Sequence, residues 1–154
     1  MIPKIKLEEG GIAPVRKTDG AAAFDCYANE SVVIKAGERK LVSLGFCVQV
    51  PEGYCLTVLP RSGNTKNGID VGTGTVDSDY RGIVHACVIN SRSSVKDFDE
   101  DGDVVGMSDF VINKGDRICQ VKFEKLTEVE YFELVDELDP TERGAGGFGH
   151  TGVR

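Results

Sequence analysis

The middle of the chain reads Gly72-Thr73-Gly74-Thr75-Val76-Asp77-Ser78-Asp79-Tyr80-Arg81-Gly82, a stretch that combines a turn with several chemically active side chains. Gly72 and Gly74 have no Cβ, so the backbone can turn tightly there and approach another group closely. Asp77, Tyr80 and Arg81 then supply a carboxylate, an aromatic ring and a guanidinium. Taken alone, the stretch fits two interpretations. It is either a hairpin whose acids satisfy their own turn amides, or a binding turn with a base, a stacking surface and an anion ligand.

Short apolar or alternating runs surround this stretch and recur about every ten residues, with turn signals between them. The 19 glycines among 154 residues also favour turns and short strands over long helices. The sequence therefore predicts an all-β sandwich or barrel. The predicted strands cover residues 4–7, 31–35, 40–49, 54–59, 83–90 and 116–126. Residues 128–138 are predicted to be extended, although their apolar residues also fit a helical stripe.

The bulk composition is that of one soluble domain, long enough to bury a core without metal or disulfide support. A net charge of −7 argues against general affinity for nucleic acid, which requires a basic surface. The five cysteines are odd in number and lack CxxC spacing, which favours reduced thiols and a cytosolic compartment. The first seven residues contain no apolar run of the length that a signal peptide or a membrane span needs.

Three segments outside the central stretch carry candidate binding groups, each with a plainer alternative. Asp25 stands in an apolar run and is either a turn-capping acid or an indirect metal holder, since a buried carboxylate needs a partner. Ser62 is a good helix cap, and a helical turn beginning there would aim backbone N–H groups at an anion beside Arg61. The alternative is an ordinary cap next to a surface arginine. Gln120 serves either an interior hydrogen bond or a ligand contact.

The C-terminal residues 142–152 are rich in glycine and contain Arg143 and Phe148. Such a composition is typical of a flexible terminus. It also fits a lid that orders over a ligand, with Phe148 stacking and Arg143 neutralising charge.

Together, and in this order, five segments resemble the motifs of the trimeric dUTP pyrophosphatase (dUTPase) family. The resemblance spans nearly the whole chain outside one insertion. It implies a jelly-roll-like β fold for residues 1–140, followed by a C-terminal lid at 141–154. The five segments are Ala22-Ala23-Phe24-Asp25-Cys26-Tyr27-Ala28, Pro60-Arg61-Ser62-Gly63, Gly74-Thr75-Val76-Asp77-Ser78-Asp79-Tyr80-Arg81-Gly82, Lys114-Gly115-Asp116-Arg117-Ile118-Cys119-Gln120 and Arg143-Gly144-Ala145-Gly146-Gly147-Phe148-Gly149-His150-Thr151-Gly152.

The resemblance also implies an activity and an assembly. A family member is expected to be a dUTP diphosphatase that hydrolyses dUTP to dUMP and pyrophosphate with Mg²⁺. That reaction limits uracil incorporation into DNA and supplies dUMP for dTMP synthesis. The family implies a homotrimer whose active sites are shared between subunits. The expected location is the cytoplasm, or the host cytoplasm or nucleus if the source is viral, and neither nucleic acid nor a membrane is an expected partner.

Site residues follow from the same resemblance. Asp77 matches the carboxylate that orients the attacking water, and Tyr80 matches the ring that stacks under deoxyribose and excludes a ribose 2′-hydroxyl. Asp25 would hold Mg²⁺ through water, because the phosphates bind most of this reluctantly dehydrated ion. Arg143 matches the ligand of the terminal phosphate and Phe148 the ring that closes over uracil. The remaining substrate-binding residues implied are Arg61, Ser62, Gly63, Thr73, Gly74, Val76, Gln120, Gly149, His150 and Thr151.

The chain departs from the family pattern at a few positions. Ala23 stands where the first motif commonly has glycine, residues 64–68 form a slightly shortened loop, and His150 replaces a small hydroxyl residue. The rival on the same fold is dCTP deaminase, which places a glutamate near the base. The stretch from Gly72 to Gly82 contains no glutamate, which favours dUTPase.

Residues 91–109 form an acidic insertion, in which six acids oppose Arg92 and Lys96. The run that begins at Asp97 matches the opening of a calcium-binding loop with acids at 97, 99 and 101, but Ser108 stands where such a loop needs glutamate. A solvated acidic loop is the favoured interpretation. Ca²⁺ binding and a regulatory protein partner, suggested by insertions at this place in some phage dUTPases, are the alternatives.

Overall fold

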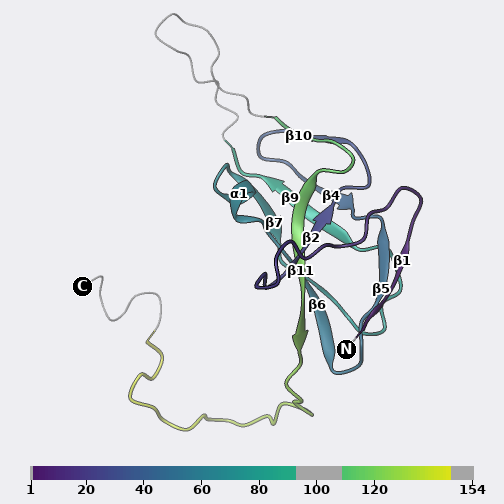
Figure 1. The fold of residues 1–154 in the computed structure, drawn as a ribbon. Coiled ribbons are helices and arrows are strands. Elements are labelled where there is room, and N and C mark those ends of the chain that lie inside the picture. The colour runs from purple at the N-terminus through teal and green to yellow at the C-terminus, as the bar shows by residue number, and fades with distance from the viewer. Residues whose placement is uncertain (1, 93–108, 147–154) are drawn as a thin grey trace, which may run out of the picture.

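A computed structural model describes residues 2–92 and 109–146. These residues form β-strands and a single one-turn helix, so the predicted all-β class is confirmed (Figure 1). The elements in chain order are β1 Lys4–Leu7, β2 Phe24–Tyr27, β3 Val32–Ile34, β4 Arg39–Ser43, β5 Phe46–Gln49, β6 Tyr54–Leu59, α1 Ser62–Thr65, β7 Ile69–Gly72, β8 Gly74–Val76, β9 His85–Asn90, β10 Phe110–Ile112 and β11 Arg117–Lys125.

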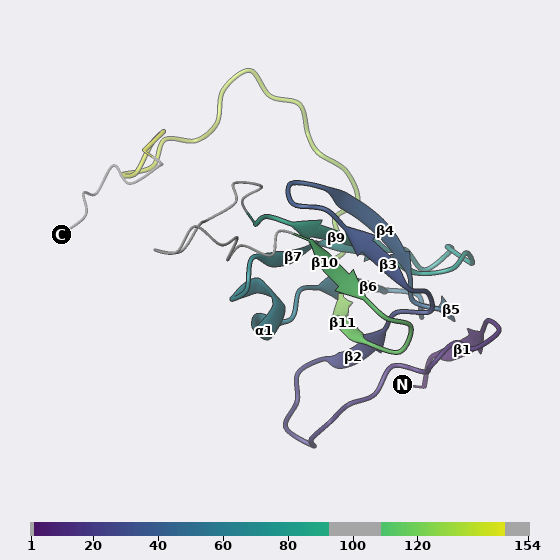
Figure 2. The ribbon, with the colours of Figure 1, turned by 90° about the horizontal axis from the view of Figure 1, so that it is seen from above.

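The strands pair into four small antiparallel sheets (Figures 1 and 2). The largest has the order β2-β11-β6-β8, and a three-stranded sheet has the order β4-β9-β7. Two further pairs, β1 with β5 and β3 with β10, complete the fold. Neighbours in a sheet are far apart in sequence, as with β2 and β11, so the fold depends on long-range pairing.

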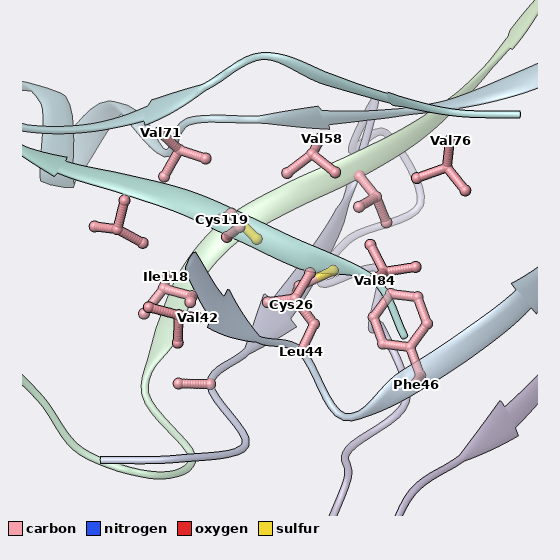
Figure 3. Close-up of a cluster of buried hydrophobic side chains, with 14 of the residues drawn as sticks. Cys26, Val42, Leu44, Phe46, Val58, Val71, Val76, Val84, Ile118 and Cys119 are labelled. Atoms are coloured by element: carbon pink, nitrogen blue, oxygen red, sulfur yellow. The ribbon is translucent and has the colours of Figure 1, made fainter. Parts of the chain in front are cut away.

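The core lies between the four-stranded and the three-stranded sheet. Figure 3 shows Val58 of β6 and Cys119 of β11 pointing into the same cluster as Val42 of β4 and Val71 of β7. Strand β9 contributes every second residue to this cluster, whereas β6 buries four consecutive residues. Burying such aliphatic side chains stabilises each by about 1.5–3 kcal/mol, which is the main term that holds the sheets together.

One predicted strand, residues 40–49, is wrong as a single element because it is divided at Gly45. This residue has a φ of +69°, and a Cβ on it would lie 2.7 Å from Cγ of Asn29. Only glycine fits both conditions, so the chain bends between β4 and β5 and enters a different sheet. By contrast, β1 and β6 have the predicted bounds.

The central stretch switches sheets and does not close a hairpin between its glycines. Strand β7, which ends at Gly72, pairs with β9, whereas β8, which begins at Gly74, pairs with β6. Thr73 therefore links the two sheets that enclose the core. The loop that follows β8 returns to the other sheet at β9.

The segment after β11 has neither helical nor strand structure between Glu128 and Leu138. Figure 1 shows it running away from the body of the molecule. Its apolar side chains are open, with Phe132 at 90% and Leu134 at 98% exposure. Such a row of exposed apolar groups is typical of a surface that binds another molecule. In residues 2–92 and 109–146, none of the helical structure is long and apolar enough for a membrane span.

Candidate functional site

The loop after β8 forms one wall of a hollow of about 210 Å³ that is lined by Asp77, the predicted catalytic residue, and by Tyr80, predicted to bind substrate. Asp77 and Tyr80 lie on this loop, and both are exposed. The residues of β8 and Val58 of β6 form another wall, and His85 at the start of β9 lines the hollow as well. The hollow thus offers a carboxylate, an aromatic ring and an imidazole beside an apolar floor.

Tyr80 is held against the backbone of its own loop. A Cβ on Gly82 would lie 2.5 Å from Cζ of Tyr80, so the ring packs directly where a side chain would otherwise stand. The phenol donates a hydrogen bond to the carbonyl of Ile83, with an O–O distance of 3.1 Å. The ring is still 45% exposed. One side of it is therefore fixed while the rest remains available for stacking.

Arg81 braces this loop from within. Its Nη1 donates to the carbonyl of Ser78 at 2.7 Å and to that of Tyr80 at 2.8 Å. The amide of Tyr80 also donates to the carbonyl of Asp77 at 3.2 Å. These bonds engage three carbonyls of the loop, and within the described residues none ties the Asp77 carboxylate to a turn amide. The loop therefore differs from one whose acid caps its own amides.

The glycines at 72 and 74 are not required by the packing of the described residues. A Cβ on Gly74 would meet Val58 at 3.9 Å, and one on Gly72 would meet Cys87 at 3.7 Å, both ordinary contacts. Neither residue has a positive φ. A side chain at either position would therefore fit the packing of the described residues, and its absence leaves the backbone open to close approach.

Asp25 is the centre of a second group of polar side chains. Its residue is 5% exposed. Its carboxylate forms ion pairs with Nε of Arg61 at 3.3 Å and Nη1 of Arg117 at 3.0 Å, and it accepts a hydrogen bond from Nε2 of Gln120 at 3.1 Å. The partners reach Asp25 because β2 pairs with β11, where Asp25 faces Gln120 directly. Asp25 thus holds two guanidinium groups and an amide in fixed positions.

The pKa of Asp25 reflects this balance. Burial is the largest single influence and raises the pKa, because it disfavours the charged form. The hydrogen bonds from Gln120 and Arg117 and the positive charges of Arg61 and Arg117 lower it, and together they outweigh burial. The pKa of Asp25 therefore lies below its ordinary value, and the carboxylate is ionised at neutral pH.

The short helix α1 begins beside this cluster. Arg61 occupies the N-cap position with extended backbone and no side-chain capping bond, so the prediction that Ser62 caps the helix is wrong by one residue. The amide of Asn64 donates to the carbonyl of Arg61, and its side chain donates to the carbonyl of Ile118 at 3.2 Å. This contact to β11 fixes the helix by tertiary structure. Ser62 and Gly63 are exposed at its start, next to the guanidinium of Arg61.

The described chain does not bring the two groups together. Gln120 pairs with Leu59, whereas Val76, directly before Asp77, pairs with Leu56 on the other side of β6. Two strand spacings and three residues along the strand separate Val76 from Gln120, or about 14 Å between their Cα atoms. The carboxylate of Asp77 and the cationic cluster therefore lie in different parts of one chain.

The C-terminal residues are placed only in part. Arg143 lies in the segment that leaves the body, where its Nε donates to the carbonyl of Gly146 at 2.9 Å. The structure does not bring Arg143 to either group. Phe148, Gly149, His150 and Thr151 lie outside the described residues, as do residues 93–108 of the acidic insertion.

Two residues of the site were not singled out by the sequence pattern. Arg117 stands within the fourth motif, and its partner Asp25 is 92 residues away. Only the pairing of β2 with β11 reveals that the two belong together. His85 shares the hollow with Asp77 and Tyr80, and its position three residues after Gly82, where the central stretch ends, was the only available signal.

Comparison with known proteins agrees with this architecture. The model of the dUTPase family matches residues 9–99 and 104–152. A deoxyuridine 5′-triphosphate nucleotidohydrolase of Fusobacterium nucleatum is 42% identical and the alignment covers 97% of this chain and 95% of that protein. The corresponding protein of Paramecium bursaria Chlorella virus 1 is 40% identical, with 96% and 95% covered.

A solved structure extends the agreement to the fold. The dUTPase of Staphylococcus bacteriophage 80alpha with dUPNHPP superposes with a TM-score of 0.85 at 26% identity, and the match covers 99% of each chain. The predicted jelly-roll-like fold is therefore confirmed. From the family model and the identity to its members over nearly the whole length, the chain belongs to the dUTPase family.

Proposed function

We propose that this protein hydrolyses dUTP to dUMP and pyrophosphate by in-line attack of water on the α-phosphorus. The observation that carries the proposal is the hollow that Asp77 and the half-exposed ring of Tyr80 line together, where the Asp77 carboxylate has no hydrogen-bond partner within the described residues. A carboxylate there can orient a water and accept its proton as the new P–O bond forms and the bond to pyrophosphate breaks. The product dUMP serves dTMP synthesis, and removal of dUTP limits uracil in DNA.

Base and sugar selection belong to the same hollow. Backbone groups from Thr73 to Val76 would bind the uracil edge, and the open positions at Gly72 and Gly74 leave space for it. Tyr80, fixed on Gly82 and Ile83, would stack under deoxyribose. A ring held on one side cannot retreat from an added 2′-oxygen, so a ribonucleotide meets a clash.

The cationic cluster is the proposed triphosphate site. Arg61 and Gln120 are held in place by Asp25, which removes most of the cost of ordering them around a ligand. Ser62 and Gly63 present exposed groups next to Arg61. Arg143 and residues 148–151 would complete the site as a lid, with Arg143 on the terminal phosphate and Phe148 over uracil.

The side chains around Asp25 fit Mg²⁺ only if the substrate's phosphates supply most of its ligands. The described residues contain no group of three or more metal-ligating His, Cys, Asp or Glu side chains. A carboxylate has about four acceptor sites, and Asp25 uses three of them, which leaves capacity for one water of a hydrated ion. Asp25 would hold Mg²⁺ through that water, and the ion would neutralise phosphate charge.

A homotrimer with shared sites would bring the separated groups together. The supporting observations are the separation of about 14 Å between Val76 and Gln120 on one sheet and the exposed apolar row of residues 126–138. In a mixed assembly, an Asp77→Asn copy and an Arg61→Ala copy would each supply the group that the other lacks. Mixing the two inactive variants after unfolding and refolding should restore a fraction of activity. No recovery in an assembly proven to be mixed would contradict shared sites.

Cellular location and additional partners are also proposals. All five cysteines are free thiols, which supports a reducing compartment such as the cytoplasm, or the host cytoplasm or nucleus for a viral source. Solvation, Ca²⁺ or a regulatory protein at insertion 91–109 remain hypotheses, because residues 93–108 lie outside the described part.

The direct test measures pyrophosphate release from dUTP, UTP, dCTP and dTTP. We expect turnover of dUTP alone, and we expect Asp77→Asn to lower kcat by about 10²–10⁴-fold, the usual contribution of a positioned base. The melting temperature should stay unchanged, because Asp77 is exposed. Ammonia release from dCTP would show a deaminase instead, and full activity of Asp77→Asn would remove its assigned role.

A further inference from the structure

We infer that His85 is a positioning residue that holds the ring of Tyr80 in place and thereby sharpens selection of deoxyribose over ribose. This inference rests on the proposed role of Tyr80. His85 is the first residue of β9, on the strand that receives the catalytic loop. Its side chain is exposed and lines the same hollow as Asp77 and Tyr80.

The two side chains share one acceptor. Nδ1 of His85 lies 2.9 Å from the carbonyl oxygen of Ile83, and the phenol oxygen of Tyr80 lies 3.1 Å from the same atom. A carbonyl oxygen has two lone pairs and no proton, so it can accept both bonds and donate neither. Nδ1 of His85 must therefore carry the proton, which assigns the tautomer.

The shared carbonyl is itself fixed. It belongs to the peptide that joins Ile83 to Val84, and the amide of that peptide donates to the carbonyl of Phe46 at 2.9 Å. The carbonyl of Val84 accepts a bond from Leu44 at 3.0 Å. Because a trans peptide is planar and its C=O points opposite to its N–H, these bonds aim the Ile83 oxygen at the two rings.

Together these contacts form a frame for Tyr80. The ring of Tyr80 packs against Gly82, and its hydroxyl donates a hydrogen bond to the Ile83 carbonyl. The imidazole of His85 donates to the second lone pair of the same carbonyl. Without the imidazole, the phenol can bond the carbonyl over a wider range of directions. The ring then gains freedom to retreat from a 2′-hydroxyl, so discrimination against UTP falls although no catalytic group is lost.

The test compares His85→Leu, which removes the donor, with His85→Asn, whose side-chain amide can still donate to the carbonyl. The readout is kcat/KM for dUTP divided by kcat/KM for UTP. We expect His85→Leu to lower this ratio about three- to tenfold, the worth of one ordinary hydrogen bond, and His85→Asn to retain most of it. Tyr80→Phe should lower the ratio similarly, and the double variant Tyr80→Phe with His85→Leu should fall by less than the product of the single effects.

A structural readout is independent of turnover. The chain contains only two histidines, so imidazole ¹⁵N spectra are simple, and His85→Asn identifies the signals of His85. Neutral His85 should show the proton on Nδ1. An Nε2-protonated form, an unchanged ratio in His85→Leu, or equal losses for both nucleotides together with a lower melting temperature would each overturn the inference. Failure of the wild-type protein to hydrolyse dUTP or to prefer it over UTP would instead overturn the proposed function.

Discussion

Replacement of Asp25 by asparagine should destabilise the fold, because this carboxylate is almost fully buried against two guanidinium groups. The substitution keeps the shape but removes the charge, and it turns an N–H donor toward Arg61 or Arg117 where an acceptor stood. Removing one partner of a buried ion pair costs about 3–5 kcal/mol. The side chain of Arg117 is 43% exposed and that of Arg61 25%, so water compensates in part and the lower end, about 3 kcal/mol, applies.

The stabilisation that the Asp25 carboxylate provides should depend on pH in a defined direction. The pKa of Asp25 is lower in the folded protein than in the unfolded chain, so the stabilisation is fully present above the unfolded pKa of about 4. It is lost as the pH falls through the folded pKa. The difference in unfolding free energy between wild type and Asp25→Asn should therefore be constant near pH 7 and shrink below about pH 4.

Urea unfolding at fixed protein concentration, at pH 7 and at several acidic values, measures this difference. Fixed concentration matters because assembly contributes to the apparent stability. Asp77→Asn is the matched control, since it makes the same chemical change at an exposed carboxylate and should change the unfolding free energy by less than about 0.5 kcal/mol. The reasoning is refuted if Asp25→Asn is as stable as wild type at pH 7, or if its deficit persists undiminished to pH 3.

Two glycine substitutions separate function from packing. Gly74→Ala should leave the melting temperature nearly unchanged, because the new Cβ meets Val58 at an ordinary 3.9 Å. It should raise KM for dUTP at least about tenfold if the base lies against this backbone. An unchanged KM would contradict the assigned base site. Gly45→Ala should lower stability by about 2–4 kcal/mol in calorimetry, since its φ is +69° and Asn29 occupies the space of the Cβ. A melting temperature equal to wild type would contradict that account.

The strands that sequence reasoning placed well are those whose signal is local. Strand β6 is a short, mostly apolar run bounded by Pro51-Glu52-Gly53 before it and Pro60 after it, and its observed bounds match the prediction. The division at Gly45 was missed because its cause is a contact with Asn29, sixteen residues earlier in the chain. A contact between residues so far apart in sequence cannot be predicted from a local run of apolar residues.

In the candidate site too, local patterns were predictable and contacts between distant segments were not. The five motifs pointed to the residue types, but the partners of Asp25 lie 92 and 95 residues away, and only strand pairing joins them. The capping position of α1 was missed by one residue, since the turn is held by Asn64 on the backbone of Ile118 and not by its own cap. Patterns within a segment indicate chemistry, and pairing between segments decides which groups meet.

The sheet switch at Thr73 makes the loop that carries Asp77 and Tyr80 dependent on the core. The loop leaves β8, which pairs with β6, and enters β9, which pairs with β4 and β7. Its two ends are anchored by Val76 and Val84, both buried in the cluster between these sheets. The distance between the sheets therefore sets the span of the loop, and with it the position of Asp77 relative to Tyr80. Because a packed core resists compression and expansion, the loop needs few bonds of its own to keep one geometry, and within the described residues those bonds do not engage the Asp77 carboxylate.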